Sequence, residues 1–446
     1  MSWLTTRRLL LAALAAWLAV AALGLVLGPP LGHDEAAFAV AARGDLPAGA
    51  WLYRSDGTVA LAWLGVALGG ADWQLRLASA LLGTAVVVAA FAVGRAAFTA
   101  RTGAWAAAVV AGAHPMVLRS AQVLSDLPAT AALLGGIAVV IGELARDGGP
   151  RWRLVAAAPL FAAAFYLRYG SAPVIALALA AAGLVWWRAV AARPVRAAAM
   201  LAALAALGVP HLVRSVAATG SPLGILAVSA GMPRQAYLGD GLVTYLASNP
   251  LAFYGALAAP VMLAGLVGLA STRRRAAWYL AIVALGQIVA LGLQSHGQPR
   301  YVYVATVLLI VLGVDAAMRL GRPRLAVAAL AAIAAAWIGA AVAMVVVCRR
   351  AEPGRASILR AADAIRRDAA GRPCAAVAAL APQLMWYARC AVYPSDLGMP
   401  LPADRVRYAV SFPRWPIQLA ATLAAQQLRA TALATGDPDA QVWRLE

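Results

Sequence analysis

The chain has 446 residues, of which 63% are hydrophobic and only 12% charged, and its mean hydropathy is +0.78. Soluble domains carry about 25% charged residues, so this composition excludes a soluble globular protein and indicates a polytopic membrane protein. The net charge of +19 comes from arginines that punctuate the apolar runs instead of gathering on one soluble face. We therefore expect no nucleic-acid partner.

The first long apolar stretch runs from Leu9 to Leu27, and Arg7 and Arg8 precede it. About 20 apolar helical residues cover the roughly 30 Å of a bilayer core, so this stretch can span the membrane. It could be a cleavable signal peptide or a retained signal anchor. We favour the anchor, because the run is long and no clear small-x-small cleavage site follows it.

Eleven apolar stretches predict eleven membrane spans, near residues 9–28, 77–98, 103–118, 127–144, 154–167, 171–187, 197–213, 250–270, 276–294, 301–318 and 325–347. Placing the N-terminus in the cytoplasm makes every second connection cytoplasmic, and arginine clusters such as Arg273–Arg275 fall in those connections. The positive-inside rule predicts this arrangement. Asp34, Glu35 and Asp126 then share the extracytoplasmic side of the cell inner (plasma) membrane, together with the C-terminal tail.

An acidic pair follows the first span, in Gly32-His33-Asp34-Glu35, within an extracytoplasmic loop over residues 29–76. Charges at a membrane surface are costly, which makes this pair a candidate functional site. The loop is rich in apolar and aromatic residues, a composition typical of helices that lie in the headgroup layer. Such a loop could present Asp34 to a lipid-borne substrate.

A second isolated acid, Asp126, stands in the run Ser125-Asp126-Leu127-Pro128. It could serve a catalytic site, or it could cap the helix that begins at the following residues, and both roles can hold together. Arg168 follows an apolar run and precedes Tyr169. It could bind a phosphate or extend its charged end to the lipid headgroups, and the sequence leaves both interpretations open.

The tail, residues 349–446, predicts a small soluble α/β domain that follows a membrane domain over residues 1–348. The spacing of apolar residues predicts helices over 356–369 and 416–434, and strands over 374–380 and 405–412. Cys374 and Cys390 bracket a short helix-like segment. We expect a disulfide between them in an oxidising compartment, with free thiols as the alternative, and their surroundings carry no zinc signature.

Three short motifs in order resemble the membrane glycosyltransferases of the GT-C fold. The nearest branch is the protein O-mannosyltransferase and lipid A aminoarabinose transferase group (glycosyltransferase family 39-like). The motifs are Asp34-Glu35-Ala36-Ala37-Phe38, Ser125-Asp126-Leu127-Pro128 and His296-Gly297-Gln298-Pro299-Arg300-Tyr301. The resemblance implies an all-α membrane domain of about eleven helices, over roughly residues 1–347.

The resemblance also implies transfer of a sugar from a polyprenyl-phosphate donor to an acceptor protein, lipid or glycan outside the cytoplasm. A single in-line attack would invert the anomeric centre, with Asp34 as the base, because the matching aspartate of the family has that role. A phosphate leaving group needs cations, and we expect them at Arg168, Arg300 and Arg54. Where related transferases have a Lys-Pro-Pro-Leu-like element, this chain has Tyr53-Arg54-Ser55-Asp56-Gly57-Thr58, which puts the donor's phosphate contacts in doubt.

The remaining candidates have supporting roles or alternative interpretations. Glu35 could orient the acceptor or help bind a divalent cation, or it could simply face water. Asp126 could bind the donor sugar or share a divalent cation with Asp34, the one cofactor that these carboxylates suggest. His33, His296 and Tyr301 are expected beside the reacting groups.

Two functions of other classes remain open. The chain could be a transporter or flippase of lipid-linked saccharides, or a non-catalytic membrane assembly protein of the same fold. Transporters usually place charges near the membrane midplane on broken helices, whereas the acids here lie at the ends of spans, which favours the transferase.

Overall fold

The computed structural model describes residues 3–46, 54–146, 150–231, 238–248, 254, 258–294, 297–319, 323–350, 353–393, 401–414, 416–417, 419, 423 and 428–446. The chain forms two compact units, each built from separate parts of the sequence. The membrane unit comprises Met1–Val26, Trp51–Thr58 and Leu77–Val345. The loop-tail unit comprises Leu27–Ala50, Val59–Arg76 and Val346–Glu446. We expected the whole first loop, residues 29–76, to belong to the membrane domain, but most of it belongs to the same compact unit as the tail.

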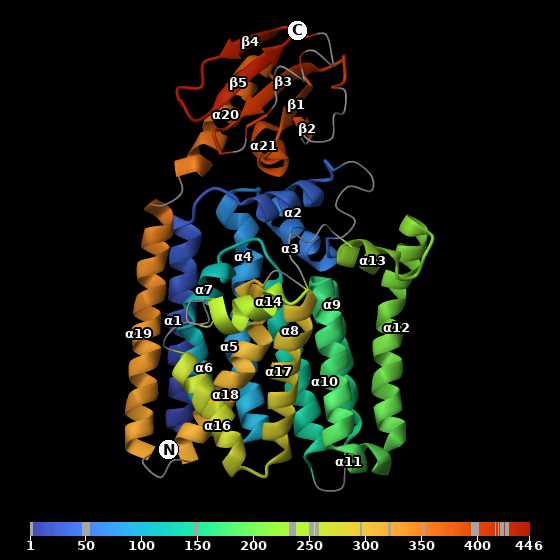
Figure 1. The fold of residues 1–446 in the computed structure, drawn as a ribbon, viewed down its shortest axis with the longest axis vertical. Helices are drawn as coiled ribbons and strands as arrows, with labels where there is room; N and C mark the ends of the chain where they lie inside the picture. Colours follow the sequence, from blue (N-terminus) through green and yellow to red (C-terminus); the bar gives the residue numbers. More distant parts are fainter. Residues whose placement is uncertain are drawn as a thin grey trace. The chain divides into compact units, whose positions relative to one another are not determined.

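The membrane unit is a helical bundle (Figure 1). Its first helices are α1 (Trp3–Leu27), α5 (Ala85–Ala97), α6 (Ala100–Ala111), α7 (His114–Ser120), α8 (Asp126–Leu144), η1 (Trp152–Ala156), α9 (Ala157–Leu167), η2 (Tyr169–Ser171), α10 (Ala172–Val185) and α11 (Trp187–Ala192). The later helices are α12 (Pro194–Thr219), α13 (Gly224–Gly231), α14 (Asp240–Val243), η3 (Thr244–Ser248), α16 (Ala259–Gly268), η4 (Leu269–Ser271), α17 (Arg275–Gln294), η5 (Pro299–Tyr301), α18 (Tyr303–Arg319) and α19 (Pro323–Arg350), whose last residues belong to the loop-tail unit.

Small residues let the helices of the bundle approach closely. A Cβ added at Gly313 of α18 would lie 1.9 Å from the carbonyl oxygen of Val261 in α16, and one at Gly94 of α5 would lie 2.6 Å from Gly103 Cα in α6. No side chain fits at such distances. Between membrane helices, lipid gives little hydrophobic driving force, so close packing of small residues is a main source of association. The high content of alanine and glycine in the sequence thus allows the helices in the core of the bundle to pack closely.

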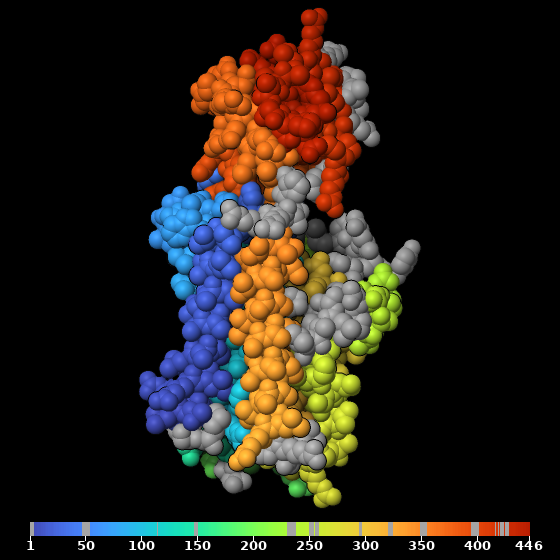
Figure 2. Space-filling view, turned by 90° about the vertical axis from the view of Figure 1, so that its left-hand side faces the viewer, coloured from blue at the N-terminus to red at the C-terminus, as the bar shows by residue number. Residues whose placement is uncertain are grey.

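Helices at the periphery present apolar side chains outward. Figure 2 shows α19 (orange) running along α1 (blue), and both are exposed over most of their length. Large exposed apolar residues on them include Leu11, Leu18, Val342 and Val346. A continuous apolar exterior of this kind fits lipid and not water.

Each of the eleven expected spans contains helix among its described residues, although short breaks interrupt some of them, as at Thr84 and Gly112. Among the described residues, six helices are long and apolar enough to cross a membrane by length and composition, whereas others, such as Trp152–Leu167, Tyr169–Val185 and Ala259–Ser271, are shorter. The multi-pass membrane architecture is therefore confirmed. The shorter pieces arise where polar or small residues interrupt a span, as at Arg168.

The loop-tail unit joins helices of the first loop to the C-terminal domain. Its loop part contains α2 (His33–Arg43), most of α3 (Asp56–Ala67) and the start of α4 (Asp72–Gly83). Its tail contains α20 (Pro353–Ala369), α21 (Ala381–Ala388) and strands β1 (Cys374–Ala378), β2 (Ala391–Tyr393), β3 (Val406–Ser411), β4 (Ala430–Leu433) and β5 (Gln441–Leu445).

The five strands form one sheet in the order β2-β1-β3-β5-β4. β1 pairs in parallel with β2 and β3, so the short helix α21 is the crossover between β1 and β2, while β5 lies antiparallel to β3 and β4. The predicted helix over 356–369 and the strands near 374–380 and 405–412 are confirmed. Cys374 and Cys390 form the expected disulfide, with a Cα–Cα distance of 4.9 Å.

The predicted helix over 416–434 is wrong at its C-terminal end. Residues 430–433 form strand β4, in which Ala430 pairs with Leu445 and Leu433 with Val442. The pattern of alternate residues there suits an edge strand as well as a helix, and pairing with β5 decides between them. The middle of the predicted helix lies mostly outside the described residues.

Candidate active site

A helix break places Arg168 at one end of the membrane bundle. α9 ends at Leu167, Arg168 is extended with φ −157° and ψ 112°, and the chain resumes through η2 into α10. The break releases the Leu167 carbonyl from helical pairing. The Ser55 and Thr58 hydroxyls donate to this oxygen at 2.7 Å and 2.9 Å, which satisfies it.

The side chain of Arg168 turns into the bundle and not toward the lipid headgroups. Its Nη1 forms an ion pair with the Asp126 carboxylate and donates to the carbonyl oxygen of Arg300 at 3.0 Å. Asp126 is the first residue of α8, its side chain is 8% exposed, and Ser125 occupies the N-cap position. Asp126 is therefore a partner of Arg168 and not the helix cap, although a carboxylate in a first turn also suits the helix dipole.

Two guanidinium groups lie near the ring of Tyr301. The Arg168 guanidinium carbon is 4.9 Å from the Tyr301 ring centroid, and that of Arg300 is 5.6 Å from it. Buried Gln287 on α17 fixes this turn, because its amide donates to the Tyr301 carbonyl at 2.8 Å and accepts from Ala305 N–H at 2.6 Å. The sequence did not single out Gln287, since a glutamine inside an apolar run gives no motif.

These four residues, Asp126, Arg168, Arg300 and Tyr301, form the cation cluster. It holds two guanidinium groups and one carboxylate, and Arg168 remains 23% exposed. Guanidinium groups match phosphate oxygens, and they act more strongly where water is excluded. The arrangement can therefore stabilise a phosphate leaving group. The structure thus brings Asp126, Arg168 and Arg300 together, although the sequence named them only as separate candidates.

A second polar group adjoins this end of α9. Asp56 forms an ion pair with Arg214 of α12, and the Tyr169 hydroxyl donates to Asp56 Oδ2 at 3.2 Å. The hydroxyl oxygens of Thr58 and Ser125 lie 2.5 Å apart, and this hydrogen bond links the segment to α8. Sequence reasoning missed Asp56 and Arg214 as a pair. The available signal was a lone arginine directly after the predicted span 197–213.

Gly57 makes the close approach of this segment to α9 possible. A Cβ at position 57 would lie 2.8 Å from the backbone oxygen of Tyr166 and 2.9 Å from the backbone nitrogen of Leu167. Backbone atoms cannot move aside as a flexible side chain can, so this position requires glycine. Arg54, half-buried, precedes the same segment.

Asp34 belongs to the loop-tail unit, near the start of α2. Its side chain is 31% exposed, and His33 Nδ1 lies 3.5 Å from its Oδ1. A carboxylate with this exposure in the first turn of a helix is accessible to a substrate hydroxyl. The His33 side chain is 44% exposed, and its supporting role stays a prediction.

Glu35 does not face water. Its carboxylate is 4% exposed and accepts from Arg76 Nε at 2.8 Å and from Arg76 Nη2 at 3.1 Å. It also accepts from Gly32 N–H at 2.8 Å, which closes the first turn of α2. The water-facing interpretation is wrong because Arg76, 41 residues later in the chain, lies beside Glu35, and no local pattern indicates that pairing.

No group of three or more His, Cys, Asp or Glu side chains that could hold a metal ion occurs among the residues that the structure describes. A divalent cation shared by Asp34 and Asp126 stays a prediction. His296 lies outside the described residues, while its neighbour Gly297 begins the described turn with φ +74°.

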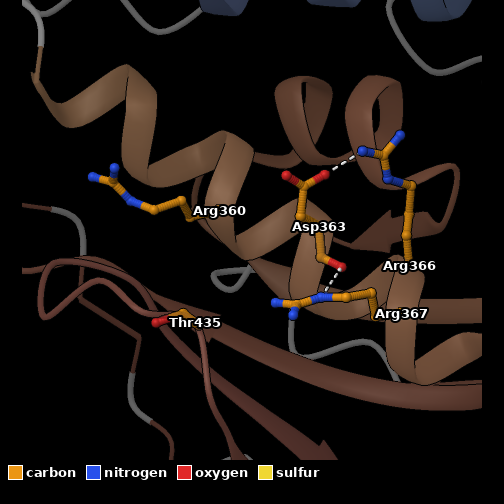
Figure 3. A pocket seen from close by; sticks show the side chains of 5 residues that line it. All are labelled: Arg360, Asp363, Arg366, Arg367 and Thr435. Carbon is orange, nitrogen blue, oxygen red and sulfur yellow. Dashed lines mark hydrogen bonds and ion pairs between the residues drawn. The ribbon is translucent and has the colours of Figure 1, made fainter.

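A further cavity of about 420 Å³ opens on the C-terminal domain (Figure 3), lined by Arg360, Asp363, Arg366, Arg367 and Thr435. Two of its arginines are already paired: Arg366 with Asp363, and Arg360 with Asp437 at 2.8 Å. Hydrogen bonds, first from Ser357 and then from Asp439 N–H and Arg360, hold the pKa of Asp437 below its usual 3.8. The third arginine, Arg367, donates from its Nε to the Asp363 carbonyl oxygen at 3.4 Å.

Comparison with known proteins identifies a matching family model and similar folds. Residues 57–213 match the family described as dolichyl-phosphate-mannose-protein mannosyltransferase. No curated protein sequence matches the chain. Among solved structures, ArnT from Cupriavidus metallidurans bound to undecaprenyl phosphate is similar with a TM-score of 0.74 and 16% identity, over 100% of this chain and 98% of ArnT.

Two structures from Archaeoglobus fulgidus are also similar. The oligosaccharyltransferase in complex with Zn and sulfate has a TM-score of 0.60 and 12% identity, over 90% of this chain and 68% of that one. AglB in complex with an inhibitory peptide and a dolichol-phosphate has a TM-score of 0.57 and 12% identity, over 88% of this chain and 65% of that one. The family match and the shared fold confirm the resemblance stated from the three motifs.

Proposed function

We propose that this chain, a membrane protein with the GT-C glycosyltransferase fold, transfers a sugar from a polyprenyl-phosphate donor to an acceptor outside the cytoplasm. Support comes from the lipid phosphates in the similar structures, undecaprenyl phosphate in ArnT and a dolichol-phosphate in AglB. The observation that carries the proposal is the cation cluster, in which the guanidinium groups of Arg168 and Arg300 lie near the ring of Tyr301.

The reaction is a single displacement at the anomeric carbon. The acceptor hydroxyl oxygen forms a bond to that carbon while the bond to the phosphate oxygen breaks, and the configuration inverts. The lipid phosphate leaves with the bonding electrons, so it needs cations and no proton donor. Asp34 takes the proton of the hydroxyl as general base.

The roles of the other residues follow from their contacts. Arg168 and Arg300 stabilise the charge that develops on the phosphate, and Asp126 holds the Arg168 guanidinium in place through their ion pair. Arg54 is a third candidate cation. Glu35 is excluded as a base because Arg76 occupies both of its carboxylate oxygens.

A transfer assay tests the proposal. The purified full-length protein, in vesicles, receives a panel of polyprenyl-phosphate sugars with a labelled sugar, and labelled product is counted. We expect Asp34→Asn to lower kcat by about 10²–10⁴-fold and Arg168→Gln by about 10²–10³-fold. Asp363→Asn, a change at a 52%-exposed acid of the tail, should leave kcat unchanged.

Two outcomes contradict the proposal. Full activity of Asp34→Asn would remove the assigned base. Movement of an intact lipid-linked saccharide across the vesicle membrane, with no transfer of sugar, would favour a flippase instead.

A further inference from the structure

The helix that carries Asp34 is too short to hold its own orientation. α2 has 11 residues, and isolated helices below about 12–15 residues are marginal in water. Tertiary contacts must therefore fix it. The structure supplies them at both ends of α2, and most come from the C-terminal domain.

At the N-terminal end, the chain is held by side chains of α21 and α20. The Tyr387 hydroxyl accepts from Leu31 N–H at 2.7 Å and donates to Asp72 Oδ2 at 2.7 Å. Arg355 Nη1 donates to the Pro30 carbonyl at 2.9 Å. Leu31 itself is fully buried. The backbone three residues before Asp34 is thus tied to the tail.

The hydroxyl of Tyr387 stays protonated in this role. Burial, and then the nearby Asp72 carboxylate, raise the pKa of Tyr387 above its usual 10. The phenol therefore remains a donor to Asp72 and an acceptor from Leu31 throughout the physiological pH range.

At the C-terminal end, Arg43 closes onto the last turn of α21. Its Nη2 donates to the Met385 carbonyl at 2.7 Å and its Nη1 to the Trp386 carbonyl at 3.2 Å, while its guanidinium carbon lies 4.6 Å from the Trp386 ring. These carbonyls belong to the last turn of a helix, where no helical N–H is available to them. A cation there also suits the helix dipole.

The disulfide between Cys374 and Cys390 restricts the movement of α21. Cys374 begins β1 and Cys390 precedes β2, so the bond closes the segment that contains α21. The crossover helix cannot drift from the sheet while the bond is intact. Both ends of α2 therefore contact α21, whose position is fixed by the disulfide.

We propose that the C-terminal domain positions the Asp34 carboxylate for proton transfer by holding both ends of α2, with Tyr387 and Arg43 as positioning residues. The inference rests on the proposed function, in which Asp34 is the base. A displacement of about 1 Å in a reacting group can cost about 10²-fold in rate. Loss of a single contact that holds α2 could therefore lower the rate of proton transfer to Asp34.

Kinetics of the full-length protein in vesicles test the inference. Tyr387→Phe removes the hydroxyl that joins Leu31 to Asp72, and Arg43→Met removes the donors to α21 while keeping an unbranched stem. We expect kcat to fall by about 10–100-fold in each, with KM for the lipid-linked donor within about twofold of wild type. Arg43→Lys, which keeps a cation, should recover part of the lost kcat.

Hydrogen exchange of the amides of residues 31–43 gives a second measurement. It should quicken in Tyr387→Phe and Arg43→Met but not in the control Asp363→Asn. An unchanged kcat in both variants, with Asp34→Asn inactive, would refute the positioning role and leave the proposed function standing. Activity of Asp34→Asn would instead refute the base, whatever the other variants show.

Discussion

The buried ion pair between Glu35 and Arg76 allows a quantitative prediction. The two side chains are 4% and 2% exposed and share two hydrogen bonds, of 2.8 Å and 3.1 Å. Arg76→Met keeps most of the volume of the stem but leaves the Glu35 carboxylate buried without its cation. Removing one partner of such a pair costs about 3–5 kcal/mol of folding free energy.

Removing both charges together should cost far less. In the double variant Glu35→Leu with Arg76→Met, no uncompensated charge remains, and such replacements are often close to neutral. The N–H of Gly32 still loses its acceptor, which costs about 0.5–2 kcal/mol. We therefore expect the double variant to be more stable than the Arg76→Met variant by about 2–3 kcal/mol.

Thermal unfolding of the full-length protein in detergent, followed by tryptophan fluorescence, measures the difference. At about 1 °C per kcal/mol for a chain of this length, Arg76→Met should lower Tm by about 3–5 °C and the double variant by only about 1–2 °C. The exposed pair Asp363–Arg366 is the matched control, because breaking it should cost at most about 1 kcal/mol. A double variant as unstable as the sum of its two single variants would refute the coupling of the pair.

Three further changes probe other parts of the fold. Gly57→Ala should destabilise the protein by about 1–3 kcal/mol through overpacking, whereas Gly339→Ala in open space should not, and Tm compares them. Replacing Cys374 and Cys390 by serine should lower stability by about 2–4 kcal/mol, and an unchanged denaturation midpoint would contradict this estimate. Because the pKa of Asp437 is lowered by folding, its carboxylate stabilises the tail above pH 4 and loses this effect as the pH falls further. The Tm difference between wild type and Asp437→Asn should therefore shrink below pH 4, and a constant difference would argue against it.

The bundle was predictable because its signals are local. Apolar runs identify the helices, and charges such as Arg168 and Asp126 are conspicuous inside or beside them. Arg300 was predicted from its motif. Four of the candidate residues of the membrane unit, Asp126, Arg168, Arg300 and Tyr301, meet in the cation cluster.

The remaining features depend on distant pairings. Glu35 could not be recognised as buried without its partner Arg76, and Asp56 could not be matched to Arg214 from spacing alone. The end of the predicted helix over 416–434 is a strand because β5, later in the chain, pairs with it. A sequence pattern describes one element at a time, whereas these residues acquire their roles from a neighbour far along the chain.

The contacts between α2 and α21 also set an order of events during synthesis. Leu31 and Tyr387 are separated by 356 residues, and Arg43 and Met385 by 342. At about 5–20 residues per second, a ribosome needs roughly 20–70 seconds to make the chain between them. The helix that carries Asp34 is thus made well before the residues of α21 that hold it. On the inference above, a nascent chain reaches its full kcat only after α21 has been translated and has docked on α2.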